Sequence, residues 1–522
     1  MMEARKQGGL YKWLALMVVV VGTFMAILDT SIVNIAIPKM MAVFGVSTED
    51  IKWVLTAYML TMGAVIPLTG YLGDRFGTKK VYMWALAAFT VGSALCGFAW
   101  SNSAMIAARI IQALGGGMIM PVSMSIIYEV VPPEERGTAL GVWGIAAMAA
   151  PAIGPTLSGY IVEHLDWRLI FTINIPVGIV GVILTGLILE EFPKRPTKGF
   201  DLMGFITVAT GLGCVLYVLG EGTSIDWNDF KNTFLLMVGV FNLVLFVVNE
   251  LTREDPLLDL RMLKIWPFSL SLVISSAINI AMFGGIFLLP LFLQNLQGYT
   301  AMQTGIIMFP SAVVTGITMP IGGKLFDKFG AKPVVIPGLV LLTLATYELS
   351  QITMDTSSTT IILISAIRGI GMGLSMMPSS TVGMNAVPPQ LVGRASALSN
   401  VVRQVAGSLG ITVLTTIMQN IQVASYYKIS EQVNWFNPGS LQVVKMLQGL
   451  FAQYGVSAGE SQGGAIGVLY GFAQKQAVLQ AIEDTFFVTF LIALGTVFLA
   501  LLLKGKQPAK PTGTGEKHVI ME

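Results

Sequence analysis

The stretch GYLGDRFGTKK, residues 70 to 80, has a second copy in GKLFDKFGAKP, residues 323 to 333. Both stretches carry an aspartate, a basic residue and the pair Phe-Gly in the same order. The two aspartates, Asp74 and Asp327, are 253 positions apart in a chain of 522 residues. A likeness at this distance indicates that the chain consists of two related halves.

Two further landmarks repeat at nearly the same offset. Pro132 and Pro388 each open a Pro-Pro pair and lie 256 positions apart. Arg109 and Arg368, each early in an apolar run, lie 259 positions apart. Three landmarks at almost one offset favour two homologous halves over chance matches.

The composition places both halves in a membrane. The chain is 54% hydrophobic and 11% charged, whereas soluble domains are roughly 25% charged. Apolar runs of about 20 residues, long enough to cross a bilayer of ~30 Å, recur along the chain. We predict fourteen, at 14–37, 52–73, 80–100, 104–127, 138–162, 168–189, 202–220, 233–250, 267–292, 302–323, 333–352, 359–383, 395–419 and 486–503.

Lysine and arginine set the predicted orientation, because cytoplasmic loops carry an excess of them. With both termini inside, the inner segments hold 21 of these residues and the outer segments seven. The net charge of +2 therefore reflects membrane anchoring and does not indicate nucleic-acid binding. We expect an all-α polytopic protein of the cell membrane, divided into a six-helix bundle (13–192), an inserted helix pair (193–265), a second six-helix bundle (266–504) and a cytoplasmic tail (505–522).

Six motifs resemble one known family. GYLGDRFGTKK is similar to the loop signature of the major facilitator superfamily, RIIQALGGGMIMP to its fourth-span motif, and GIAAMAAPAIGPTLSG to the fifth-span motif of its antiporters. LDTSIVNIAIP, WRLIFTINIPVG and LPLFLQNLQGYTAMQTG resemble the fourteen-span drug:proton antiporters of the EmrB/QacA type. The resemblance implies the major facilitator fold, two six-helix bundles that rock about a central cavity, and alternating access driven by a proton gradient without another cofactor.

The duplicated loop is the predicted cytoplasmic gate. Its glycines allow helix ends to approach closely, and its charges offer a latch at the inner mouth. The alternative is a hydrated hairpin whose basic residues only set topology. The candidate gate residues are Gly70, Asp74, Arg75, Gly77 and Asp327.

The antiporter motif is the predicted hinge on the outer side. Its residues Pro151, Gly154, Pro155 and Gly159 lie in one span. Proline frees a backbone carbonyl, and small residues permit tight helix packing. A packing kink of the kind found in many membrane helices is the alternative.

Asp29 is a carboxylate in the first apolar run, where a charge costs at least ~2.5 kcal/mol. Asp29 and Arg109 both fall roughly 8 Å below the outer boundary, at ~1.5 Å per residue. Burial favours protonated Asp29 and a nearby arginine favours the ionised form, so movement of Arg109 would change proton affinity. The alternative is a static ion pair between two helices. Glu348, at similar depth in the other half, is a second candidate for proton coupling.

Aromatic, sulfur-containing and amide side chains are the candidates for a substrate cavity, because such groups suit lipophilic and cationic compounds. Packing in the core or against lipid is the alternative for each of them. Arg368 and Arg403 could instead recognise an anion or bind helix carbonyls. The candidates are Asn34, Tyr58, Trp143, Asn174, Phe283, Gln294 and Arg403.

Residues 421–485 form a predicted external connection that is far longer than ordinary loops. Within it, LQVVKMLQGLFAQYG at 441–455 has the spacing of an amphipathic helix. Such a helix could cap the external mouth, lie on the lipid surface or contact a partner.

The leading hypothesis is a proton-driven exporter of lipophilic, cationic drugs that functions as a monomer. An exporter of an anionic or neutral metabolite, or of a lipid, is the runner-up. A receptor or scaffold is a third possibility. A membrane enzyme or a metal site is disfavoured, because both histidines fall outside the predicted spans and both cysteines inside them.

The lysine and arginine distribution generates a topology prediction. A cysteine in place of Ser440, in the predicted external connection, should react with an impermeant thiol reagent added to intact cells. Reaction only after permeabilisation would reverse the predicted orientation.

Overall fold

The computed structural model describes residues 9–192, 194, 199–220, 229–432, 437–454 and 457–503. These residues form helices joined by short connections, without a strand among them. The predicted tail at 505–522 lies outside the described residues. In chain order the main helices are α1 (Gly9–Phe44), α2 (Thr48–Val65), α3 (Leu68–Phe76), α4 (Thr78–Gly97), α5 (Asn102–Val130), α6 (Arg136–His164), α7 (Leu169–Thr172), α8 (Asn174–Ile188), α9 (Leu202–Gly220), α10 (Phe230–Thr252), α11 (Trp266–Leu291), α12 (Ala301–Phe329), α13 (Lys332–Leu349), α14 (Ser358–Asn385), α15 (Val392–Gln432), α16 (Pro438–Gln453) and α17 (Ala458–Ala500).

Thirteen of the described helices are long and apolar enough to cross a membrane, and the bent pair α2 and α3 raises the number to fourteen. We predicted that pair as one straight span. The structure bends it by 54° beside Pro67, which has no N–H for a helical hydrogen bond and begins the second segment. The remaining predicted spans coincide with single helices, apart from short breaks at α7 and after α11.

The duplicated loops adopt the same turn. Gly77 ends α3 and Gly330 ends α12, and both have a positive φ, 96° and 85° respectively. This backbone conformation strains residues that carry a side chain, so glycine is required at both positions. The 253-residue repeat therefore has the same local geometry in both halves.

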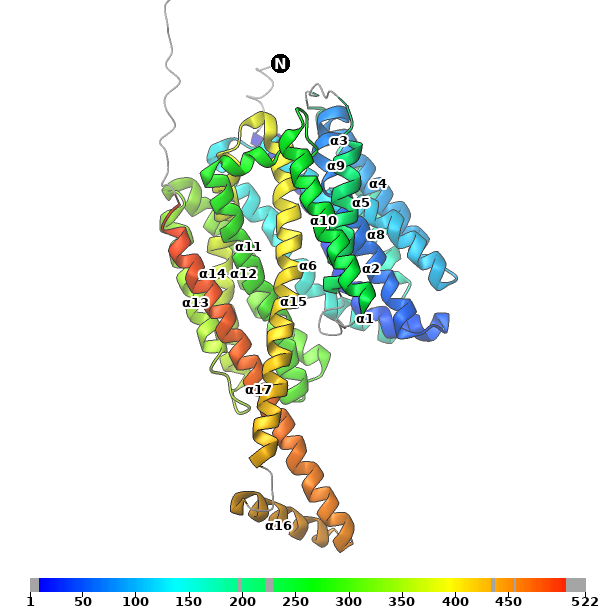
Figure 1. Ribbon diagram of the computed structural model, residues 1–522. Helices are drawn as coiled ribbons and strands as arrows, with labels where there is room; N and C mark the ends of the chain where they lie inside the picture. Colours follow the sequence, from blue (N-terminus) through cyan, green and yellow to red (C-terminus); the bar gives the residue numbers. More distant parts are fainter. Residues whose placement is uncertain are drawn as a thin grey trace, which may run out of the picture.

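The inserted pair, α9 and α10, packs at the boundary between the two halves. The two helices contact each other, and α9 also contacts α2 of the first half and α15 of the second. Figure 1 shows the pair running along the bundle beside α2 rather than across one of its ends. The insertion is thus placed where movement between the halves would act on it.

We predicted residues 421–485 as a long external connection from hydropathy. The structure shows that the described residues of this segment are mostly helical. α15 and α17 continue as helices far beyond the apolar runs, and α16 crosses their far end (Figure 1). The 43 residues of α17 span about 65 Å, roughly twice a hydrocarbon core. The predicted amphipathic helix is confirmed as α16, whose Val444 is buried and whose Phe451 packs at Gly464. Because α16 lies at the tip of this hairpin, it does not cover the mouth of the bundle.

Candidate functional site

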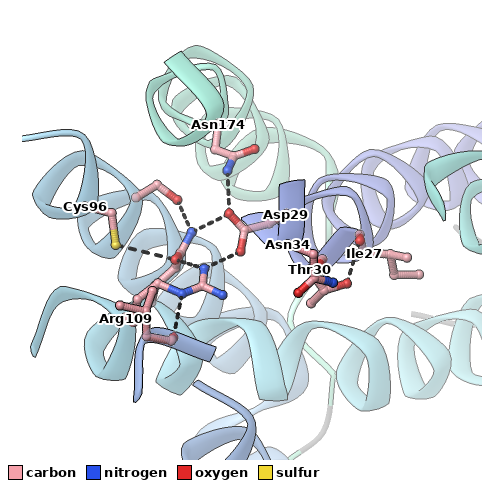
Figure 2. A network of polar contacts seen from close by, with 10 residues as sticks. Ile27, Asp29, Thr30, Asn34, Cys96, Arg109 and Asn174 are labelled. Carbon is pink, nitrogen blue, oxygen red and sulfur yellow. Dashed lines mark hydrogen bonds and ion pairs between the residues drawn. The ribbon is translucent and has the colours of Figure 1, made fainter. Parts of the chain in front are cut away.

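Asp29 lies on α1 with its side chain fully buried. Its oxygen Oδ2 accepts a hydrogen bond from Arg109 Nη1 at 2.6 Å, and Oδ1 accepts from Gln112 Nε2 at 2.8 Å and Asn174 Nδ2 at 3.1 Å. Figure 2 shows Arg109 and Asn174 approaching the carboxylate from different helices. The charge predicted inside the first span is therefore paired and fully hydrogen-bonded.

Arg109, on α5, is 1% exposed. Its Nη1 also donates to Gln112 Oε1 at 2.6 Å, and its Nε donates to the Val54 carbonyl at 3.5 Å. The guanidinium carbon lies 3.8 Å from the centre of the Tyr58 ring, a cation–π distance. The cationic group is thus held by a carboxylate, an amide, a carbonyl and an aromatic face.

Gln112 orients this cluster, and the sequence analysis missed it. Its Nε2 donates to Asp29 and to Ser93 Oγ at 2.7 Å, and Cys96 Sγ lies 3.7 Å from its Oε1. The close approach of α4 and α5 brings these groups together: a Cβ on Gly92 would stand 2.4 Å from the Gln112 backbone. The available signal was an amide one helical turn after Arg109 inside an apolar run.

The second half has a different arrangement at the equivalent place. The repeat offsets of 253 to 259 map Asp29 onto residues 282–288 of α11, MFGGIFL, so the carboxylate has no counterpart there. Arg368, the counterpart of Arg109, instead donates to the main-chain carbonyls of Ala281 and Met282. Of the two alternatives for Arg368, the structure favours binding to helix carbonyls.

The duplicated aspartates contact the opposite half of the molecule. Asp74 Oδ2 lies 3.2 Å from Arg394 Nε at the start of α15. Asp327 accepts hydrogen bonds from the Gly137 and Thr138 main-chain N–H groups, both at 2.9 Å, at the start of α6. Each aspartate thus reaches the first turn of a helix in the other half, where the helix dipole favours a negative charge.

We call these two contacts the latch, and the end of the molecule that carries them the latch end. Arg136 and Ser396 add bonds between the halves there, from Nη1 to Asn385 Oδ1 at 2.9 Å and from Oγ to the Pro121 carbonyl at 2.9 Å. The halves are therefore joined at this end by several polar contacts, as the gate prediction requires.

Other gate candidates support the loop conformation. A Cβ on Gly70 would stand 3.1 Å from Arg394 Cα, so the glycine allows α15 to approach α3. Gly77 makes the turn described above. Arg75 is exposed; its Nη1 donates to the Tyr71 hydroxyl and does not reach the other half in an observed hydrogen bond. The structure thus assigns the latch cation to Arg394.

The hinge candidates lie on α6, which stays one helix from Arg136 to His164. A Cβ on Gly154 would stand 2.7 Å from Ser31 Cβ on α1, whereas Gly159 has open space around it. Pro151 is half-buried, and the Pro155 side chain lies outside the described set. The motif therefore provides close packing of α6 on α1 at one of its glycines.

The cavity candidates are spread over several environments. Tyr58 and Asn174 belong to the Asp29 cluster, and Trp143 is buried, donating from Nε1 to Thr23 and Ser123 hydroxyls at 3.0 and 3.1 Å. Phe283 packs at Gly407. The remaining candidates have more exposure: Asn34 and Gln294 are exposed, and Arg403 is half-buried with Nη2 donating to Asn400 Oδ1 at 3.1 Å.

Glu348 is exposed near the end of α13 and belongs to the other half. The structure therefore does not bring the two carboxylates predicted for proton coupling together. Among the described residues, no group of His, Cys, Asp and Glu side chains has the arrangement of a metal site.

A search against family models finds the Major Facilitator Superfamily over residues 19–411. The chain belongs to this superfamily. It is a multi-pass membrane transporter and not an enzyme, and its fold is the major facilitator fold. The family membership that the six motifs indicated is confirmed.

Individual relatives agree with this assignment. The chain is 38% identical to the uncharacterized MFS-type transporter YhcA of Bacillus subtilis, over 94% of this chain and 92% of that protein. It is 31% identical to the multidrug export protein EmrB of Escherichia coli, over 92% and 93%. The proton:xylose symporter XylE shares the fold, with a TM-score of 0.58 and 14% identity over 95% of this chain and 96% of that one.

The latch generates a prediction. Asp74→Asn removes the ion pair with Arg394 while keeping the shape of the side chain, and hydrogen bonds to charged groups contribute about 1.5–3 kcal/mol. A cysteine in place of Ser125, which faces Gly393 of α15 with its Oγ 4.0 Å from the site of an added Cβ, should then react with thiol reagents about tenfold faster. Cys96→Ser and Cys214→Ser provide the background, and an unchanged rate would show that Asp74 does not hold the halves together.

Proposed function

We propose that this protein is a proton-coupled exporter of lipophilic, cationic compounds. It works in the cytoplasmic membrane by alternating access, as a monomer with both termini inside, so that the latch end faces the cytoplasm. The observation that carries the proposal is the buried Asp29–Arg109 pair, because a carboxylate inside a membrane helix is a group that can bind and release a proton.

The geometry suits a switch in proton affinity. A proton on Oδ2 of Asp29 would displace the 2.6 Å hydrogen bond from Arg109, so protonation and the ion pair exclude each other. Protonation would leave Arg109 with Gln112, the Val54 carbonyl and the Tyr58 ring. Since these partners lie on α2 and α5 and Asp29 on α1, protonation weakens one contact between helices of the first half.

The relatives support export as the direction of transport. EmrB is named a multidrug export protein, and LmrB of Listeria monocytogenes, 31% identical over 77% of this chain and 85% of that protein, is named a lincomycin resistance protein. Drug export by this chain would confer antibiotic resistance.

The runner-up, export of an anionic or neutral metabolite or of a lipid, depends on a different residue. An anion needs a cationic side chain on its path. Arg368 is engaged with main-chain carbonyls, so Arg403 is the arginine that this alternative requires. Arg403 lies on α15, is half-buried and contacts Met124 of α5. This position is the specific observation in favour of the runner-up.

Transport in inverted membrane vesicles tests the function. A lipophilic cation added to vesicles with an imposed pH difference should be accumulated and should release protons from the lumen. Proton movement with an anion instead would support the runner-up. Absence of proton movement with every compound would support the receptor or scaffold hypothesis.

The Asp29→Asn variant tests the coupling residue. The amide keeps shape and hydrogen bonding but does not titrate, so proton-coupled export should fall to background while drug binding remains measurable. A static lock predicts instead that the uncompensated Arg109 costs about 3–5 kcal/mol and lowers expression. Thermal stability and expression are measured beside transport.

Glu348→Gln makes the same chemical change at the exposed carboxylate that is the second coupling candidate, so the two variants are compared directly. If Asp29→Asn is stable and still moves drug against its gradient under a pH difference, Asp29 is not the coupling group. Loss of transport in Glu348→Gln would then assign coupling to Glu348.

A further inference from the structure

A second pair of buried carboxyl groups lies in the inserted helices, away from the Asp29 cluster. Asp201 precedes α9 and is 1% exposed, and Glu250 lies in the last turns of α10 and is 0% exposed. Both groups lie toward the latch end. Neither takes part in the coupling scheme proposed above.

Asp201 is surrounded by donors. Oδ1 accepts from the Gly204 N–H at 2.9 Å and lies 3.5 Å from Arg253 Nη1. Oδ2 accepts from Asn249 Nδ2 at 2.8 Å. These contacts leave the Asp201 carboxylate with two hydrogen-bond donors and one cation.

Glu250 has one satisfied and one unsatisfied oxygen. Oε2 accepts from the Leu258 N–H at 2.9 Å, whereas the buried Oε1 has no hydrogen-bond partner among the described residues. A Cβ on Gly204 would stand 2.6 Å from this Oε1 and 2.5 Å from Asp201 Oδ2, so the two oxygens face the same point. Two buried carboxylates this close disfavour double ionisation, and a proton on Oε1 would turn the contact into a hydrogen bond to Asp201.

A short segment connects this pair to the latch. Leu258, held by Glu250, follows Asp255 and Pro256, which both contact Arg394. Arg394 Nη2 lies 2.7 Å from Asp255 Oδ1, and Nη1 donates to the Pro256 carbonyl at 3.2 Å. The latch arginine is thus shared between Asp74 of α3 and the segment that follows α10.

The charged groups around Glu250 come from five parts of the chain. They are Asp201 before α9, Arg253 at the end of α10, Asp255 and Arg261 on the segment after α10, and Arg394 of α15 with its partner Asp74 of α3. Arg253 contacts Asp201, and Arg261 donates to the Leu251 and Arg253 carbonyls. Arg394 is the one of these cations whose position changes if α15 moves away from α3.

We propose that Asp201 and Glu250 form a proton-binding site that holds one proton between them while the latch is closed and releases it as the latch opens. Withdrawal of α15 removes Arg394 from the 255–258 segment, loosens the packing over Glu250 and admits water to the pair. Loss of the proton places two negative charges together and favours this opening. The inference rests on the proposed alternating access, but not on proton coupling at Asp29.

Infrared spectroscopy tests the proton itself. The purified protein at neutral pH should show the C=O absorption of a buried protonated carboxyl group, and Glu250→Gln should remove it. Glu460→Gln, the same change at an exposed carboxylate of α17, is the matched control and should leave the band unchanged. A spectrum that is the same with and without Glu250 would overturn the site, whatever the outcome of transport assays.

Thiol labelling tests the link to the latch. With the cysteine at Ser125 described above, the labelling rate is divided by that of the cysteine at Ser440 at the same pH, which corrects for ionisation of the thiol itself. This relative rate should become faster as pH rises, by up to about tenfold per pH unit for one proton. Glu250→Gln should label slowly and without this pH dependence, because its amide donates to Asp201 as the protonated acid does. Asp201→Asn removes the neighbouring charge and should shift the pH dependence to lower pH.

The Asp74→Asn variant separates this inference from the proposed function. This variant opens the latch by removing the Asp74–Arg394 ion pair and leaves Glu250 unchanged. Faster labelling of the cysteine at Ser125 in this variant therefore shows that the two halves can separate. Suppose that Asp74→Asn labels faster, but that the labelling rate changes neither with pH in the parent protein nor on Glu250→Gln substitution. This result would overturn the linked site and leave alternating access intact. Slow labelling in every variant would contradict both.

Discussion

An arginine inside the hydrocarbon layer needs an acceptor for its donors, and this requirement shapes both halves of the molecule. Arg109 meets it with Asp29, Gln112 and a main-chain carbonyl. Among the described residues, Arg368, at the equivalent place, donates from Nη2 to carbonyls of α11, and its buried Nε has no hydrogen-bond partner. A carbonyl cannot bind a proton at ordinary pH, whereas a carboxylate can. The repeat has therefore kept the arginine in both halves and the titratable partner in one.

The same duplicated sequence produces two unlike contacts at the latch end. Asp327 accepts directly from the Gly137 and Thr138 main-chain N–H groups in the first turn of α6, and also from the Thr138 hydroxyl at 2.8 Å. Asp74 acts through Arg394, which is also bound to Asp255. A contact through side chains can be altered by whatever else binds the arginine. The Asp74 side of the latch is for this reason the side open to control by the inserted helices.

The sequence revealed the features whose chemistry contrasts with their surroundings. Asp29 and Arg109 are charges in apolar runs, and their shared depth predicted a contact that the structure shows at 2.6 Å. Gln112 is neutral and was missed, although it bonds both. Asp201 lies just before the predicted span 202–220 and Glu250 is the last residue of the predicted span 233–250, at span ends where ionic residues are usually solvated. Only the packing of α9 on α10 reveals that they are buried. Hydropathy also ended α15 too early and began α17 too late, because glutamine, serine and lysine stop a membrane span without stopping a helix.

The position of the inserted pair gives it a role beyond filling space. α9 contacts both α2 and α15, and α2 carries Tyr58, which covers Arg109. Movement of α15 relative to α2 must therefore shift α9 or break its contacts with one of them. The carboxyl pair lies at one end of α9 and the Asp29 cluster beside α2, so one helix adjoins both buried ionisable sites. Proton occupancy at either site would then influence the packing of α9 on which the other site depends. The influence would come from the different stability of the arrangements with α15 close to α2 and with α15 moved away, rather than from direct charge interaction.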